Sequence, residues 1–389
     1  MPDTTLVTNQ KELDMVATRY QHAKELAIDT ESNGIYVYNE HVCLIQLGTE
    51  DSNYIIDPQK LSNLESLGSV LSNPDISKVI HGSDYDLRCL DRDYGFNIKS
   101  IFDTQVAARF LGDTHPNLAS VLEIYLGVHI SKSHHLQTSN WGLRPLSEAA
   151  IDYAAADVNH LLSLSKELKT NLSKLDRLSW VEEECQRLER IRYVAPDPPE
   201  IAFLKIKGSN KLSSKGLAIL KELFSWRDSQ AKAADIPPSR IIINETMIRL
   251  ATTADEIRSS DQTTVNKIII DELETQSRLP QTRIREISET ILKAMKGPEF
   301  YRPGVKHESR AWTTKSREIL KLLKRWRQDK STELSLDPSL LWPTRSFERI
   351  ALDISVWESE ITYSEATSVR AWQIAQFANE ISSQLSDFV

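Results

Sequence analysis

Two acidic residues, Asp29 and Glu31, end an apolar run in the segment "LAIDTES" (residues 26–32). Residues i and i+2 of a β-strand face the same side, so the two carboxylates would project together. Two bare anions about 5–7 Å apart repel each other by about 2–3 kcal/mol at an effective dielectric of about 20. A divalent cation between them would reverse the sign of that energy, whereas water would solvate both acids at an exposed strand end. The segment therefore predicts either a cation site or a solvated strand end.

Further polar residues lie where they could join this pair. Asp84 and Asp86 follow an apolar stretch in "VIHGSDYDLRCL" and begin a predicted helix, where an acid can also act as an N-cap or helix-dipole partner. Tyr153 and Asp157 in "YAAADV" are four residues apart and share one face of a helix, with three alanines between them that leave space near the backbone. Such a pair is also typical of a helix surface. His81 fits both substrate contact and simple packing.

The segments that carry these residues alternate between strand and helix patterns. The stretches "KELAIDTE", "HVCLIQLG" and "NYIIDP" predict an antiparallel meander, and "SKVIHG" and "KSIFDT" predict two further strands. A helix is predicted around "KELDMVATRY", and another over "DYDLRCLDRDYG" ends at Gly95, a suitable C-terminal cap. Asp103 is expected to cap the helix that follows it rather than to bind metal. The N-terminal part is therefore predicted to be α/β.

From about residue 145 onward the pattern is helical. Ser147 is the predicted N-cap of a helix whose buried stripe, at helical spacing, is Ile151, Ala155, Val158 and Leu162. A long helix is predicted near residues 174–193. The next segment, "VAPDPPEI" (residues 194–201), holds three prolines in eight residues and is typical of a linker.

The remaining sequence contains an internal repeat of about 100 residues. In each copy an amphipathic helix reaches a Trp-Arg pair, a polar stretch with proline follows, and a second helix ends in an apolar residue and alanine. The pairs are Trp226-Arg227 and Trp326-Arg327. Two related helical domains are therefore predicted, over residues 205–297 and 311–389.

Composition and charge limit the classes of protein that remain. The chain has 389 residues, 40% apolar and 26% charged, which is typical of a soluble globular protein with two or three domains. There is no long apolar run for a membrane span, the N-terminus is polar, and the three cysteines are far apart, so a cytoplasmic protein is expected. Residues 1–200 hold 18 Lys and Arg against 30 Asp and Glu, whereas residues 201–310 hold 19 against 14. The acidic N-terminal part could hold cations, and the basic residues of 201–310 could contact phosphates.

Together these motifs resemble the tyrosine subclass of the DEDD superfamily of 3′–5′ exonucleases, and within it the ribonuclease D family with its exosome-associated relatives. The segments that carry the resemblance are "IDTES", "VCLIQLG", "HGSDYDL", "FDTQVAARFLG" and "NWGLRPLSEAAIDYAAADVNHLL". The repeated helical units resemble the HRDC domain. The sequence departs from the family pattern at Ser131 and Asn140, where acids are common, and this could change how the 3′ end is held.

The resemblance implies individual roles. Asp29, Glu31, Asp86 and Asp157 would be the metal ligands, with Asp86 preferred over Asp84 because it stands five residues after His81 and precedes Leu87. Tyr153 would orient the attacking water. These five residues, Asp29, Glu31, Asp86, Tyr153 and Asp157, form the predicted catalytic set. The residues expected to contact substrate are His81, Gln46, Trp141 and Arg144.

The resemblance also implies an architecture and an activity. The expected fold is a ribonuclease-H-like α/β exonuclease domain with a mixed sheet flanked by helices (residues 1–195), a proline-rich linker (196–204), a first HRDC domain (205–297), a second linker (298–310) and an HRDC-like domain (311–389). The expected activity is hydrolysis of RNA 3′ ends, tRNA precursors above all, with two divalent ions, Mg²⁺ or Mn²⁺, and no obligate protein partner. A 3′–5′ DNA exonuclease with the same site, or a non-catalytic RNA-binding protein, is the alternative.

Overall fold

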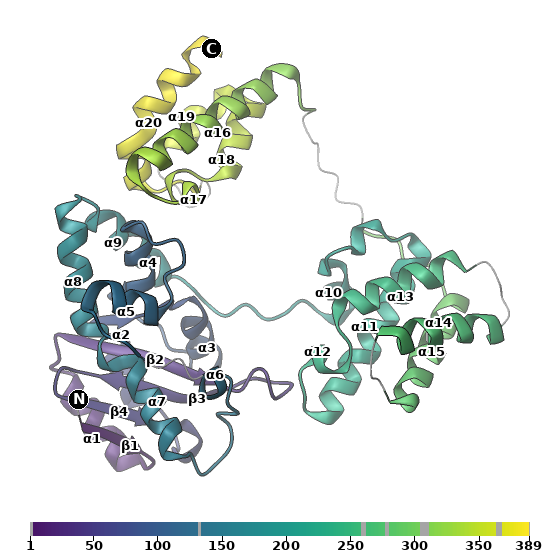
Figure 1. The fold of residues 1–389 in the computed structure, drawn as a ribbon, viewed down its shortest axis with the longest axis horizontal. Helices are drawn as coiled ribbons and strands as arrows, with labels where there is room; N and C mark the ends of the chain where they lie inside the picture. Colours follow the sequence, from purple (N-terminus) through teal and green to yellow (C-terminus); the bar gives the residue numbers. More distant parts are fainter. Residues whose placement is uncertain are drawn as a thin grey trace. The chain divides into compact units, whose positions relative to one another are not determined.

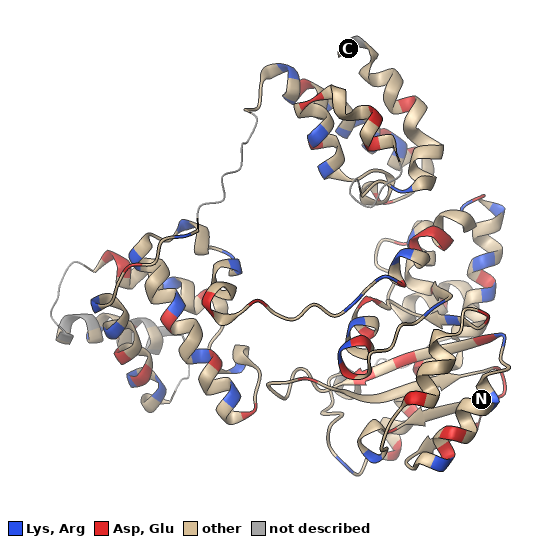
Figure 2. Ribbon diagram, turned by 180° about the vertical axis from the view of Figure 1, so that it is seen from behind, with Lys and Arg blue, Asp and Glu red and all other residues tan. Residues whose placement is uncertain are grey.

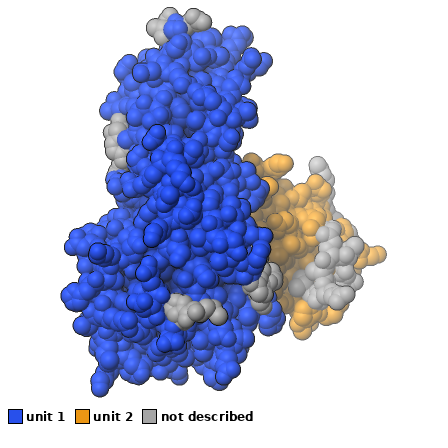
Figure 3. Space-filling view, turned by 60° about the vertical axis from the view of Figure 1, so that its left-hand side comes forward, with its two compact units in different colours: residues 1–32, 42–193, 308–389 blue, residues 33–41, 194–307 orange. Residues whose placement is uncertain are grey.

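The computed structural model describes residues 3–130, 134–257, 262–276, 280–303, 311–362 and 368–388 (Figure 1). These residues fall into two compact units, one made of residues 1–32, 42–193 and 308–389 and the other of residues 33–41 and 194–307 (Figure 3). None of the helices in the described part of the chain has the length and apolar character that a membrane span requires.

The N-terminal part of the first unit is a mixed sheet with helices on both faces (Figure 1). Its elements are β1 (Asp3–Val7), α1 (Gln10–Tyr20), β2 (Glu25–Ser32), β3 (Val42–Gly48), β4 (Ser52–Ile56), α2 (Glu65–Ser72), β5 (Ser77–Ile80), α3 (Asp84–Tyr94), β6 (Ile101–Asp103), α4 (Thr104–Phe110), α5 (Leu118–Leu126), α6 (His134–Gln137), α7 (Glu148–Asn159), α8 (Leu161–Lys174) and α9 (Leu178–Leu188).

The six strands are ordered β1-β4-β3-β2-β5-β6. The predicted antiparallel meander is confirmed, because β3 pairs antiparallel with both β2 and β4, and the two further predicted strands, β5 and β6, extend the sheet in parallel beside β2. The edge strand β1, parallel to β4, was missed. Its sequence "DTTLV" has only two apolar residues at its end, and it becomes a strand through pairing with β4 rather than through its own pattern.

The two faces of the sheet carry different layers. Alternate residues of β2 and β3, such as Ile28 and Ile45, pack with α1, α2 and α3 in one apolar cluster. The opposite face is covered by α7 over β2, β3 and β4, and by α8 over β2 and β5. Because the side chains of a strand alternate, Asp29 and Glu31 lie on the face that α7 covers.

Several helix ends are as predicted, and some are not. Gly95 caps α3 in the left-handed conformation, Ser147 accepts a hydrogen bond from the Ala150 amide at the start of α7, and Asp103 caps α4. The long helix expected near residues 174–193 is wrong in extent, because the chain turns at Asp176 (φ 55°) and α9 covers only residues 178–188. The buried stripe of α7 consists of Ala150, Ala154, Ala155 and Val158; the predicted Ile151 and Leu162 are only partly buried, since the helix ends at Asn159 and α8 starts anew.

The second unit contains an all-α bundle made of α10 (Pro199–Ala202), α11 (Ser214–Ala234), α12 (Pro238–Ile241), α13 (Asn244–Glu256), α14 (Gln262–Gln276) and α15 (Gln281–Lys296). Its core gathers apolar residues such as Leu220, Leu250 and Ile287. Tyr38, from the loop between β2 and β3, packs against this core, and its hydroxyl donates to Asp228 at 2.8 Å.

The C-terminal helices repeat part of this bundle. They are α16 (Thr314–Leu334), α17 (Pro338–Leu341), α18 (Thr344–Leu352), α19 (Trp357–Ile361) and α20 (Ala371–Leu385), and the first three begin 100 residues after α11, α12 and α13. Equivalent contacts recur. The Arg227 guanidinium donates to the Ile242 carbonyl at 3.2 Å and that of Arg327 to the Trp342 carbonyl at 2.9 Å. The sequence repeat is therefore also a repeat in structure.

The C-terminal helices pack against α4 and α9 of the N-terminal part. Trp372 stacks on Trp180 with ring centroids 4.7 Å apart, and its edge meets Phe110 at 5.4 Å. The Glu183 carboxylate accepts from the backbone amides of Ala371 and Trp372, at the N-terminus of α20, where a negative charge is favoured. The interface thus combines packed aromatic rings with hydrogen bonds from Glu183 to the start of α20.

Replacing Trp372 by alanine should destabilise the first unit strongly. The side chain is 5% exposed and fills the space between three aromatic rings, so its removal should lower the free energy of unfolding by about 3–5 kcal/mol. Chemical denaturation of the full chain measures the change. The matched control is Trp312→Ala, where the side chain is 37% exposed and the expected change is within about 0.5 kcal/mol. Equal effects of the two substitutions would contradict this packing.

Candidate active site

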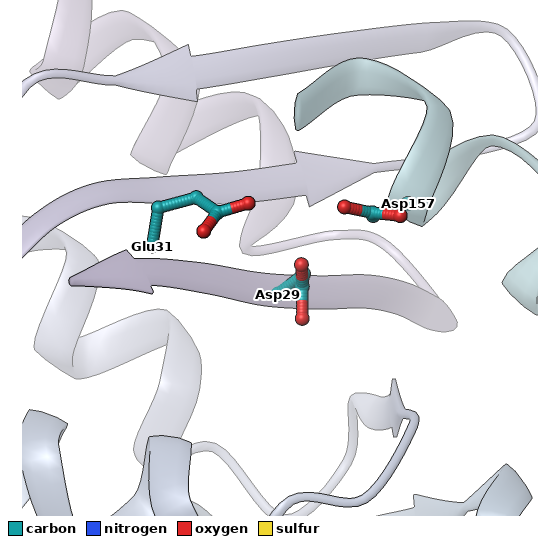
Figure 4. Close-up of side chains that lie close together, drawn as sticks. All are labelled: Asp29, Glu31 and Asp157. Carbon is teal, nitrogen blue, oxygen red and sulfur yellow. The ribbon is translucent and has the colours of Figure 1, made fainter. Parts of the chain in front are cut away.

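Three carboxylates from two distant segments meet over the sheet. Asp29 and Glu31 project from β2, and Asp157 projects toward them from α7 (Figure 4). Each offers one carboxylate oxygen, and these three oxygens lie within 4.8 Å of one another. Such a group of hard oxygen donors fits a divalent cation that prefers carboxylate ligands.

Close packing of α7 on the sheet brings Asp157 to this point. The buried side of the helix is made of Ala154, Ala155 and Val158, and its alanines add little bulk between the helix and the strands. Gly48 of β3 allows the same close approach, because a Cβ there would lie 3.3 Å from the Val158 side chain. Larger residues at these positions would push the helix, and Asp157 with it, away from β2.

A fourth acid, Asp86, lies beside the three. It sits in the first turn of α3, is 7% exposed, and accepts a hydrogen bond from the Thr30 hydroxyl. Its charge also acts on Asp29 and Glu31, whose pKa values it raises. Asp84 instead points to solvent, where its carboxylate pairs with the Arg88 guanidinium at 2.8 Å. Of the two candidates at this position, Asp86 is the one beside the cluster.

The four carboxyl groups oppose one another's ionisation. Burial raises the pKa of Glu31 to about 9, and the nearby charges of Asp157 and Asp86 add to the effect. Burial raises the pKa of Asp157 to about 7 and that of Asp86 to about 7, the latter partly offset by the Thr30 hydrogen bond. The pKa of Asp29 is raised well above its usual range, first by burial and then by the other three acids. Closely spaced buried anions of this kind are stable together when a cation neutralises them.

Tyr153 lies one helical turn before Asp157. Its ring is 6.1 Å from that of Trp141, and it lines the same cleft as the three acids. Burial and the charges of Asp157, Glu31 and Asp29 raise the pKa of the Tyr153 hydroxyl above its ordinary value. The phenol therefore stays protonated at neutral pH and can donate one hydrogen bond.

His81 also lines this cleft, but it is engaged within the protein. Its Nε2 lies 3.0 Å from the Pro116 carbonyl and its Nδ1 lies 2.9 Å from the Thr104 hydroxyl. Burial lowers the pKa of His81, and its Nε2 donates to the Pro116 carbonyl, which can only accept. His81 directly follows β5, so this contact links β5 to Pro116. Pro116 precedes Asn117, which is the N-cap of α5. A contact between His81 and substrate stays a prediction.

The other three residues predicted to contact substrate lie behind or beside the cleft. Gln46 is fully buried in β3, and Trp141 is 1% exposed within an apolar cluster. The Arg144 guanidinium donates to both carboxylate oxygens of Asp57, at 2.6 and 2.8 Å, and to the carbonyls of Trp141 and Cys43. These contacts assign Arg144 to holding the loop before α7 in place, and a direct contact with substrate stays a prediction for all three.

Part of the cleft was not visible from the sequence. It has a volume of about 870 Å³ and continues from the acids to an apolar wall of Leu118, Ile130 and Leu136, with Gln105 and Gln137 beside it. These residues come from separate short segments that carry no shared pattern. Of the two departures from the family pattern, Asn140 accepts from the Gly142 amide, and Ser131 lies outside the described residues.

The metal-free protein should lose stability as the pH rises from about 4 to about 9. The four carboxyls have higher pKa values in the folded state than in the unfolded state, so over this window the folded state holds protons that the unfolded state has released. Thermal unfolding in EDTA across this range measures the effect. Asp29→Asn removes one repelling charge and should raise the free energy of unfolding at about pH 8 by about 2 kcal/mol. Excess Mg²⁺ or Mn²⁺ should stabilise the native protein and not the variant.

The matched control for this experiment is Asp84→Asn, which removes a nearby acid that faces solvent and pairs with Arg88. This variant should leave the pH dependence unchanged. A metal-free Asp29→Asn protein less stable than the native one at about pH 8 would contradict the mutual repulsion.

Two family models match separate parts of the chain, one in the N-terminal α/β part and one in the helical part. A family model described as 3′-5′ exonuclease matches residues 4–173, and one described as HRDC domain matches residues 216–256. A protein named ribonuclease D from Granulibacter bethesdensis is 28% identical over 385 residues, which cover 96% of this chain and 94% of that protein.

Solved structures show the same similarity. Escherichia coli RNase D has a TM-score of 0.71 at 23% identity and 99% coverage of both chains, which shows a shared fold. The catalytic core of RRP6 from Trypanosoma brucei has a TM-score of 0.61 at 27% identity and covers 76% of this chain and 80% of that one. The chain thus contains a 3′-5′ exonuclease domain followed by an HRDC domain, and over nearly its whole length it is similar to a protein named ribonuclease D.

Proposed function

We propose that this chain is a metal-dependent 3′–5′ exoribonuclease that hydrolyses the terminal phosphodiester of RNA and releases nucleoside 5′-monophosphates. The observation that carries the proposal is the convergence of the Asp29, Glu31 and Asp157 carboxylates, with Asp86 beside them, in a cleft of about 870 Å³. In the described part of the chain, the charges that act on Asp29 and Glu31 come from acids, so the set opposes folding when ionised.

The four acids would hold two divalent ions, and we propose Mg²⁺ or Mn²⁺, since the donors are all carboxylate oxygens. Such ions, when bound, acidify an attacking water and stabilise the charge that develops on the leaving 3′ oxygen. Asp29 is central among the acids, because the charges of the other three all act on it.

Tyr153 would orient the water. Its hydroxyl is on the helix that carries Asp157 and borders the cleft, and its raised pKa keeps the proton on the phenol. A protonated phenol positions a nucleophile by a hydrogen bond and is a poor general base at neutral pH. The apolar wall of Leu118, Ile130 and Leu136 would face the terminal base or sugar.

The names of the similar proteins point to RNA as the substrate. The similar proteins are named ribonuclease D, and the Escherichia coli structure is described as an exoribonuclease involved in structured RNA processing. We extend this to the present chain and propose structured RNA 3′ ends, tRNA precursors among them, as its substrates. Matched RNA and DNA oligonucleotides would separate this activity from that of a DNA exonuclease with the same acids.

The helical domains would bind the nucleic acid. Residues 201–310 carry 19 Lys and Arg against 14 Asp and Glu, whereas residues 1–200 carry a net excess of acids. Figure 2 shows basic residues along the helices of the second unit. We propose residues 205–297 as an HRDC domain and, from the repeat of α11–α13 in α16–α18, residues 311–389 as an HRDC-like domain. Residues 301–330 hold 10 Lys and Arg against 3 Asp and Glu and could also contact phosphates, and residues 304–310 of this segment lie outside the described part.

Asp157→Asn should abolish hydrolysis and leave RNA binding largely intact. The amide keeps the size of the side chain but removes one anionic metal ligand, so the rate of 5′-monophosphate release from a 3′-extended tRNA should fall by at least about 1000-fold. Tyr153→Phe, which removes only the hydroxyl, should lower kcat by about 100-fold with KM nearly unchanged. Both rates are measured with Mg²⁺, with Mn²⁺ and with EDTA.

The control for these variants is Glu148→Gln, which removes an exposed acid in the first turn of α7 that does not line the cleft. It should retain most of the activity. Turnover by Asp157→Asn at the native rate with metal present would refute the assigned site.

Reversing two exposed charges in the second unit should weaken RNA binding. The double variant Lys207→Glu with Lys211→Glu changes two exposed lysines near the start of the bundle. Its affinity for a long RNA should fall by about tenfold at low salt, and the dependence of affinity on salt should become less steep. Cleavage of a short oligonucleotide should be unaffected. The same reversals at Lys166 and Lys174, exposed on α8, are the control, and an equal loss there would argue against a special role of the helical domain.

A further inference from the structure

Gln46 lies beside Asp29 in the sheet and on the same face. The strands β2 and β3 pair in the register Ala27 with Gly48, Asp29 with Gln46 and Glu31 with Leu44. Directly opposed residues of an antiparallel pair have their Cβ atoms about 4.5–5.5 Å apart on one face of the sheet. The Gln46 side chain therefore starts next to that of Asp29, under α7.

The surroundings of Gln46 are otherwise apolar. On the same face, Leu44 stands two residues earlier in β3 and Ile55 is the cross-strand partner in β4. Both belong to the cluster that contains Trp141, Ala154 and Ala155. A glutamine in this layer cannot reach solvent, and its exposed fraction is 0%.

The amide of Gln46 has no hydrogen-bond partner among the described residues, at either Nε2 or Oε1. A buried amide without a partner costs free energy, and an apolar side chain of the same length would pack here without that cost. The Asp29 carboxylate, on the residue directly opposite Gln46 in the strand pair, is a side chain that could use a donor.

We infer that Gln46 is a positioning residue for the metal site: its Nε2 donates to the carboxylate of Asp29 when this carboxylate binds a cation, and so fixes its orientation. The inference rests on the proposed function, because it assigns Asp29 as a ligand. In this role Gln46 acts on the site through Asp29. A carboxylate has two oxygens with several acceptor positions, so it can bind an ion and accept a hydrogen bond from an amide at once.

An uncharged donor suits this position. A lysine or arginine beside Asp29 would neutralise the acid and compete with the cation, whereas an amide leaves the full negative charge available. Partners of this kind hold a ligand in its binding conformation, and their loss lowers metal affinity by about 10–100-fold.

Gln46→Met tests the inference. Methionine keeps the length of the side chain and removes both polar atoms. The dissociation constant for Mn²⁺, measured by calorimetry on the full chain without substrate, should rise by at least about tenfold. The thermal stability of the metal-free protein should stay the same or increase, because an unpaired buried amide is removed. With Mn²⁺ in excess, kcat should recover and KM for a short oligonucleotide should equal that of the native chain.

Gln373→Met is the matched control. Gln373 is a glutamine with 2% exposure in α20, and its Nε2 donates to the Leu340 carbonyl at 2.6 Å. Its replacement should lower thermal stability and leave the Mn²⁺ dissociation constant unchanged. The two glutamines thus separate a role in the fold from a role at the metal site.

Three outcomes decide the matter. A folded Gln46→Met protein with native Mn²⁺ affinity, beside a native chain that binds Mn²⁺, overturns the role of Gln46 alone. A native chain that binds no Mn²⁺ overturns the proposed function. If Gln46→Met does not fold, Gln46→Glu replaces the donor by a further acid beside Asp29; its metal-free stability should fall, and Mn²⁺ should restore it. A loss of stability that Mn²⁺ does not reverse also overturns the inference.

Discussion

Repulsion among buried carboxylates is the constraint around which the N-terminal domain is arranged. Asp29, Glu31, Asp86 and Asp157 come from three elements, and burial raises the pKa of each. The neighbouring acids raise the pKa values of Asp29 and Glu31 further. The rest of the domain must hold these groups together against that force. It does so with the central strand β2, which pairs with β3 on one side and, over Glu25–Ala27, with β5 on the other, and with large apolar clusters on both faces of the sheet.

Small residues at the contact between α7 and the sheet are the second requirement. Ala154, Ala155 and Gly48 let the helix approach the strands, which sets the height of Asp157 above β2. The polar groups around the cleft are held in turn: Arg144 is fixed by Asp57, and His81 links Thr104 to the Pro116 carbonyl. The cleft therefore rests on regular elements and anchored loops rather than on free side chains.

The helical parts follow a different principle. The same three-helix order appears twice, with Trp226 bonded to Glu286 and Trp326 bonded to Glu380. The second copy has an additional surface, around Trp372, that packs against α4 and α9, so part of its apolar area serves the interface with the N-terminal domain. The helices α11–α13 and α16–α18 thus share a local fold, but they pack against different neighbours.

The sequence by itself determined the strand pattern of the sheet, except for β1, as well as the helix caps at Ser147 and Asp103 and the identity of the acids, because these depend on local periodicity and on residue types with few alternatives. It left open whether Asp84 or Asp86 faces the site, and it could not place the apolar wall of the cleft. Tertiary structure decided both, since α3 docks so that Asp86 meets Thr30 while Asp84 pairs with Arg88 in solvent. The register that sets Gln46 beside Asp29 was likewise decided by strand pairing, because a shift by one residue would have turned the glutamine to the opposite face.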